Sequence, residues 1–127
     1  MSKKVLVVDD EPDAQAFVAS VLGDDYTVTT AGSADDGLAQ ARADTPDLMI
    51  LDVQMPGKDG FVLFDELGHD DALKNVPVIM LTGIAEKTGM KFSAEDMNEF
   101  IGRSPVAYLE KPIDPDALAK TVAEVLE

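Results

Sequence analysis

The sequence has 127 residues, enough for one domain with a proper core, and its lack of cysteine excludes a disulfide framework and a thiolate metal site. Its formal net charge of −15 argues against nucleic acid or an anionic membrane as a partner, because both attract a basic surface. Since the apolar runs are too short for a membrane span or a signal peptide, we expect a cytoplasmic protein.

The first half of the chain alternates short strands with amphipathic helices. Residues 5–8 and 48–51 are apolar on both faces, which is typical of central strands in a parallel sheet, whereas 26–30 alternates polar and β-branched residues like a strand nearer the edge. Helices are predicted at 12–22, with Pro12 in the first turn and Gly23 after the last, and from the capping box of Ser33 to about Ala43.

The second half continues the alternation. A helix at 61–67 ends near Gly68, and strands are predicted at 78–81 and 106–109. Residues 83–92 indicate a loop, and a short helix over 93–101 follows it. Asp114 caps the last helix, which has Pro115 at its first position. Five strands alternating with five helices predict right-handed crossovers and a parallel sheet covered on both faces, in a single domain over residues 1–127.

Polar side chains follow four of the predicted strands, and parallel strands carry all their carboxyl ends to one edge of the sheet. The side chains are Asp9, Asp10, Asp52, Thr82 and Lys111. Carboxylates brought together repel one another, and a hard cation such as Mg²⁺ removes that repulsion. With a lysine for phosphate oxygens and a hydroxyl donor, the set predicts phosphoryl transfer to an aspartate.

Each member of this set has a simpler explanation when taken alone. Asp9 and Asp10 could cap a helix, Asp52 or Thr82 could begin a turn, and Lys111 could be a solvated surface residue. The combination is more specific than any member, because every one of these residues comes just after an apolar strand.

The chain resembles the receiver domain of two-component response regulators over essentially all of its length. The resemblance rests on residues 7–11 (VVDDE), 51–60 (LDVQMPGKDG), 81–83 (LTG) and 108–112 (YLEKP). It implies a flavodoxin-like doubly wound α/β fold with strand order 2-1-3-4-5. It also implies a phosphoacceptor domain rather than an enzyme, with no output domain attached, as in single-domain regulators.

The same resemblance assigns roles to individual residues. Asp52 accepts a phosphoryl group from a histidine kinase or a histidine phosphotransfer protein, followed by slow self-catalysed dephosphorylation. Asp9, Asp10, Asp52 and the backbone carbonyl of Gln54 hold Mg²⁺. Lys111 pairs with the phosphate, and Thr82 and Tyr108 form the switch pair.

Output is expected through the face formed by the fourth helix, the fifth strand and the fifth helix, which meets an unknown downstream protein. Its candidate contacts are Met97, Phe100, Arg103 and Tyr108. The stretch from Thr82 to Lys111 is several residues longer than is typical of the family, with the excess at 83–92. That loop is either ordered by phosphorylation or a passive insertion.

Two details near the site are also predictions. The Lys111–Pro112 peptide bond is expected to be cis, because the resemblance to receiver domains implies a bend here that directs Lys111 into the site. Gln54 either tunes the lifetime of the phosphorylated state or is an exposed turn residue. The only histidine, His69, is expected at the surface away from the strand ends, so the phosphodonor histidine belongs to another protein.

Four other functions are alternatives to this interpretation. A haloacid-dehalogenase-type phosphatase would need a second acid two residues after Asp52, where Gln54 stands. A flavin-binding module would need a phosphate-cradling loop where residues 9–11 are acidic. A degenerate receiver that only binds partners is opposed by the complete set of acids, threonine and lysine. A receiver that relays or drains phosphate within a phosphorelay fits the same residues.

Overall fold

The computed structural model describes residues 3–53, 55, 60–82, 106–110 and 113–126, and it has the predicted architecture. Five parallel strands form one sheet in the order β2-β1-β3-β4-β5. The strands are β1 (Lys4–Val8), β2 (Thr27–Ala31), β3 (Leu48–Asp52), β4 (Val78–Thr82) and β5 (Ala107–Glu110). Each strand lies within one residue of its prediction, so the sequence reading of the sheet is confirmed.

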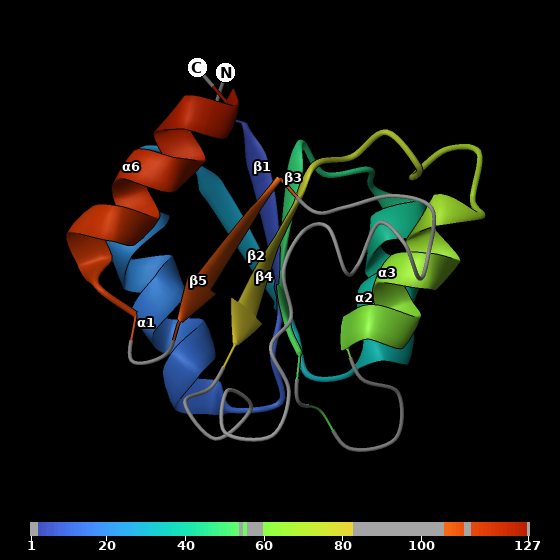
Figure 1. Cartoon of the computed structure of the whole chain (residues 1–127), viewed down its shortest axis with the longest axis horizontal. Coiled ribbons are helices and arrows are strands. Elements are labelled where there is room, and N and C mark those ends of the chain that lie inside the picture. The colour runs from blue at the N-terminus through green and yellow to red at the C-terminus, as the bar shows by residue number, and fades with distance from the viewer. Residues whose placement is uncertain (1–2, 54, 56–59, 83–105, 111–112, 127) are drawn as a thin grey trace.

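Four helices cover the described sheet, and two of them lie on each face (Figure 1). They are α1 (Pro12–Leu22), α2 (Ala34–Ala43), α3 (Gly60–Gly68) and α6 (Pro115–Leu126). Two predicted caps are present: Ser33 Oγ accepts the Asp36 N–H at 3.1 Å, and Asp114 Oδ2 accepts the Ala117 N–H at 3.3 Å. The predicted loop at 83–92 and the predicted helix at 93–101 lie outside the described residues.

The two faces of the sheet bury two separate apolar cores, because successive side chains of a strand point in opposite directions. Leu6 and Val8 of β1 pack with α2 and α3, whereas Val5 and Val7 pack with α1 and α6. All five residues of β3 and of β4 are buried, as expected for central strands. The predicted edge strand β2 is mostly exposed and lies at one side of the sheet, next to β1.

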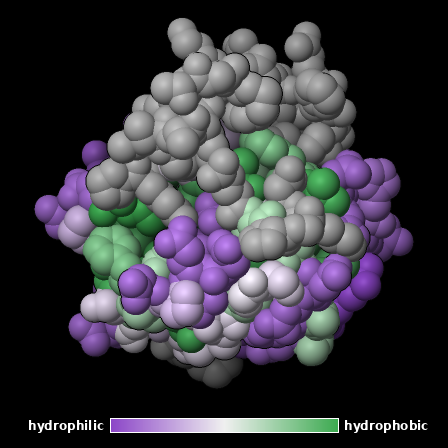
Figure 2. Space-filling model, turned by 90° about the horizontal axis from the view of Figure 1, so that it is seen from below, coloured by the Kyte–Doolittle hydropathy of each residue, from purple (hydrophilic) through white to green (hydrophobic). Residues whose placement is uncertain are grey.

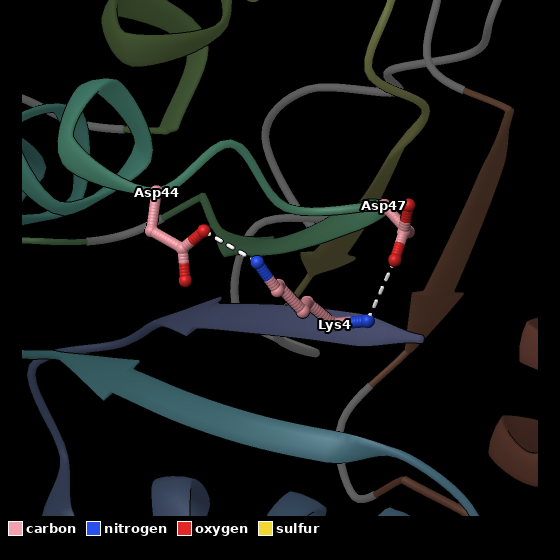
Figure 3. A network of polar contacts seen from close by, with 3 residues as sticks. All are labelled: Lys4, Asp44 and Asp47. Carbon is pink, nitrogen blue, oxygen red and sulfur yellow. Dashed lines mark hydrogen bonds and ion pairs between the residues drawn. The ribbon is translucent and has the colours of Figure 1, made fainter. Parts of the chain in front are cut away.

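The chain starts β1 and finishes α6 on the same side of the molecule, with α6 packed beside α1 (Figure 1). Lys4 lies at this amino end of the sheet, where its Nζ donates to Asp44 Oδ1 at 2.5 Å and its backbone N–H to Asp47 Oδ2 at 2.8 Å (Figure 3). Nearby in the fold, Arg42 Nε donates to Asp70 Oδ2 at 2.8 Å. Within the described ranges, no helix is long and apolar enough to span a bilayer.

Candidate functional site

An acidic cluster lies where β1 and β3 end. The two strands pair directly, with Val8 opposite Leu51, so the residues that follow β1 come close to Asp52 at the end of β3. The acidic cluster consists of Asp9, Asp10, Glu11 and Asp52. Each of these residues offers a carboxylate oxygen, and these oxygen atoms all lie within 4.8 Å of one another. The predicted convergence of Asp9, Asp10 and Asp52 is therefore present, and Glu11 joins them.

The members of the acidic cluster differ in burial. Asp9 is 0% exposed and Asp52 3% exposed, whereas Asp10 is intermediate and Glu11 is exposed. The cluster therefore has a buried floor and an open side. Seen from the end of the molecule at which the strands finish, hydrophilic residues gather at the centre of the described surface (Figure 2).

Hydrogen bonds fix the backbone on both sides of Asp9. Its N–H donates to the Ala31 carbonyl at 3.0 Å, which continues the pairing of β1 with β2 beyond the strand. Its carbonyl accepts from Gln15 Nε2 at 2.6 Å, and its Oδ1 accepts the Glu11 N–H at 3.0 Å. Sequence reasoning did not single out Gln15, because a polar residue on a surface helix gives no signal of what it touches.

Among the described residues, Thr82, the last residue of β4, is a further buried polar side chain at this edge. Asp52 stands opposite Leu81 in the sheet, so Thr82 follows one position further along the neighbouring strand. Thr82 is 9% exposed. Tyr108 on β5 stands opposite Met80, two positions before Thr82, and is half-buried against the core on the α2 and α3 face. The structure thus places both predicted switch residues on adjacent strands.

Gly60, the first residue of α3, makes a close approach to the end of β3. Its N–H donates to the Val53 carbonyl at 2.9 Å. A Cβ at this position would stand 2.4 Å from the Asp52 carbonyl oxygen, closer than any side chain tolerates. The absence of a side chain therefore lets α3 start directly against the backbone that carries Asp52.

Several predicted site residues lie outside the described residues: Gln54, Lys111, Pro112, Met97, Phe100 and Arg103. The predicted cis bond and the roles of these side chains stay predictions. His69 is described, and its side chain is 76% exposed after the end of α3, so its predicted surface position is confirmed.

The donor set of the acidic cluster fits a hard divalent cation. All four side chains are carboxylates, and oxygen is the ligand that Mg²⁺ and Ca²⁺ prefer. Two of them are almost fully buried, where the mutual repulsion of like charges is strongest. A bound dication would offset that repulsion, and the open side formed by Asp10 and Glu11 leaves room for its waters or for a substrate oxygen.

The strand order and the acids beyond the carboxyl ends of two central strands define a doubly wound α/β protein of the flavodoxin-like class. The chain matches the model of the response regulator receiver domain over residues 5–123, and it belongs to that family. The predicted resemblance, fold and class of function are therefore confirmed: the chain is a receiver domain of two-component phosphorelay signalling.

Individual relatives agree with this assignment. Protein PilH of Pseudomonas aeruginosa is 32% identical over 128 residues, which cover 97% of this chain and 97% of PilH. Response regulator PleD of Caulobacter vibrioides is 34% identical over 119 residues. Those residues make up 90% of this chain but 24% of PleD, so the chain spans about a quarter of that relative's length.

A solved structure shares the whole fold. The Vibrio cholerae chemotaxis protein CheY4 superposes with a TM-score of 0.84 at 31% identity, over 99% of this chain and 100% of that one. Membership of the receiver family favours the receiver interpretation over the phosphatase and flavin alternatives. The family is one of signalling phosphoacceptors, which interact with histidine kinases or phosphotransfer proteins and with downstream targets.

Proposed function

We propose that the chain accepts a phosphoryl group on Asp52, with Mg²⁺ held by Asp9, Asp10, Asp52 and the Gln54 backbone carbonyl. The observation that carries this proposal is the gathering of the carboxylates from the ends of β1 and β3 within 4.8 Å of one another. Asp52 lies on a buried strand end, which gives its carboxylate a fixed direction. The position of Asp52 beside other acids, at the edge where such sheets bind ligands, supports it as the acceptor.

In this mechanism an Asp52 carboxylate oxygen attacks the phosphorus of a phosphohistidine. The new O–P bond forms as the N–P bond breaks, and the imidazole keeps the electron pair of the broken bond and takes up a proton from water. When bound, Mg²⁺ would neutralise negative charge on the phosphoryl group during its transfer. Attack of water on the phosphorus later releases phosphate and restores the Asp52 carboxylate, so the domain is consumed and regenerated rather than turning over like an enzyme.

The remaining roles belong to the same proposal. Thr82, at the end of the strand beside β3, offers its hydroxyl to a phosphoryl oxygen, and Lys111 pairs with another. Movement of Thr82 and a rotamer change of Tyr108 then alter the face that includes β5, through which a downstream protein is engaged. The phosphodonor histidine belongs to another protein, because His69 is remote from Asp52 at the opposite end of α3. That protein is a histidine kinase or phosphotransfer protein of the cytoplasm.

The test is phosphorylation of the full chain by acetyl phosphate with Mg²⁺, read by intact mass. We expect the mass of one phosphoryl group to be gained, and the gain to disappear in Asp52→Asn and after chelation of the metal. Asp44→Asn is the matched control, since Asp44 is an exposed acid at the other end of the sheet. A gain that persists in Asp52→Asn, or without metal, would contradict the proposal.

A further inference from the structure

The side chain of Gln15 connects α1 to the ends of two strands. Its Nε2 donates to the Asp9 carbonyl at 2.6 Å and to the Ala31 carbonyl at 3.3 Å. Asp9 directly follows β1, and Ala31 is the last residue of β2. A side-chain amide nitrogen carries two hydrogens, one for each of these carbonyls. The side chain is partly buried, so the two bonds are shielded from competing water.

The contact with Gln15 completes the fixation of Asp9. The Asp9 N–H is already held by Ala31, and its carboxylate accepts the Glu11 N–H. Without Gln15, the Asp9 carbonyl would lose this hydrogen bond, and the peptide plane that leads to Asp10 would be less constrained. Since Asp9, Asp10 and Glu11 supply three of the four acids in the cluster, the Gln15 bond constrains most of the cluster through one peptide group.

We propose that Gln15 is a positioning residue for the metal site: by holding the Asp9 carbonyl, it fixes residues 9–11 in the arrangement that binds Mg²⁺. This inference rests on the proposed function of the acidic cluster. Mg²⁺ demands near-ideal octahedral geometry, whereas Ca²⁺ accepts irregular and larger coordination shells. A segment released from Gln15 therefore loses affinity for Mg²⁺ more than for Ca²⁺.

The chain offers a matched control in Gln40, on the opposite face of the sheet. Gln40 Nε2 donates from α2 to the Thr30 carbonyl of β2 at 3.0 Å, and to Asp36 Oδ2 at 3.2 Å. It is the same kind of bond, from a helix glutamine to the backbone of the same strand, one residue before Ala31. Gln40 contributes no ligand atom to the acidic cluster. Gln40→Met therefore removes a comparable structural bond without releasing Asp9.

The experiment measures Mg²⁺ and Ca²⁺ dissociation constants by calorimetry, and metal-free stability by urea unfolding, for the full chain and its Gln15→Met and Gln40→Met variants. Groups that orient metal ligands typically change metal affinity by tenfold or more, so we expect Gln15→Met to raise the Kd for Mg²⁺ about tenfold. The Kd for Ca²⁺ should rise less. Gln40→Met should leave both constants unchanged, even where it lowers stability.

Two results would overturn the inference: an unchanged Kd for Mg²⁺ in Gln15→Met, or the same change in both variants. If Gln15→Met does not fold, Gln15→Asn serves instead, because it keeps a polar amide but shortens the reach by one methylene; an unchanged Kd there overturns the inference as well. Mg²⁺ binding by the unaltered chain with no effect of Gln15 contradicts this inference alone. No Mg²⁺ binding by the unaltered chain contradicts the proposed function too.

Discussion

The two ends of the sheet arrange their acidic side chains in opposite ways. At the amino end, acids bond to cationic side chains: Asp44 to Lys4 (Figure 3), and Asp70 to Arg42. The hydrogen bond with Asp44 raises the pKa of Lys4, and the hydrogen bond with Arg42 lowers the pKa of Asp70. At the carboxyl end, acids meet other acids, and two members of that cluster are buried.

The two ends of the sheet therefore differ in what their acidic side chains do for stability and for function. Lys4, Asp44 and Arg42 at the amino end are exposed and Asp70 is only partly buried, so these ion pairs contribute little to folding and fix local geometry at most. The acidic cluster at the carboxyl end brings like charges together, which opposes folding and creates a place for a cation. Substitutions and added salts can perturb each end of the sheet separately.

Gly60→Ala should disrupt the carboxyl end most strongly. The added Cβ meets the Asp52 carbonyl oxygen at 2.4 Å and the Val53 Cα at 3.0 Å, so backbone has to move. Overpacking of this kind costs about 1–3 kcal/mol of the free energy of unfolding, measured by urea denaturation. We also expect loss of phosphorylation. Gly32→Ala is the control, because its Cβ would find its nearest neighbour, Gln15 Nε2, at 3.9 Å. Equal effects of the two variants would argue against a special role for Gly60.

Mg²⁺ should stabilise the chain, and chelation should reverse the effect. A ligand that binds only the folded state at a hundredfold excess over its Kd adds about 2.7 kcal/mol to the free energy of unfolding. Thermal unfolding at increasing Mg²⁺ measures it. Potassium chloride of equal ionic strength controls for general screening of the net charge of −15. The same stabilisation by both salts would show that no specific site is involved.

Asp52→Asn should stabilise the metal-free chain. Asparagine keeps the shape of the side chain but removes one charge from the acidic cluster, and the relieved repulsion is on the order of 1 kcal/mol. Urea unfolding in the presence of a chelator measures the change. At the amino end, Asp44→Asn should show no such gain, since it removes the partner of Lys4. If the metal-free Asp52→Asn chain unfolds at a lower urea concentration than the unaltered chain, the repulsion argument is refuted.

Arg42→Met should give the smallest effect, one that depends on pH. Because Arg42 lowers the folded-state pKa of Asp70 below its ordinary 3.8, their pair stabilises the fold above that value, and the contribution is lost as the pH falls through the lowered pKa. The stability difference between the variant and the unaltered chain should therefore be full near neutral pH and shrink in acid. A difference that is constant between neutral and acid pH would exclude this linkage.

The central strands of the sheet were predictable because they are unbroken apolar runs between turn residues, as at 48–51. The gathering of Asp9, Asp10 and Asp52 was predictable as well, since parallel strands must end at one edge. Glu11, directly before the predicted helix at 12–22, was not among the predicted metal ligands. Its contribution became visible when the fold turned its side chain towards the cluster.

The supporting contacts could not be predicted. Gln15 occupies a helix position that the sequence pattern leaves polar, and nothing in that pattern indicates that β2 ends within its reach. Gly60 belongs to the stretch 51–60 that carries the family resemblance, but its packing against the Asp52 backbone depends on the angle at which α3 starts. Both depend on distances between segments far apart in the chain, which local periodicity does not encode.

The start of β1 and the end of α6 share the side of the molecule that lies opposite the acidic cluster (Figure 1). A fluorescent protein, affinity tag or tether fused at either terminus would therefore project away from Asp52. Because both attachment points lie at the same side, a donor and an acceptor dye placed at the start of β1 and the end of α6 would share one side of the folded chain. Such a pair would report unfolding without obstructing the approach of a kinase.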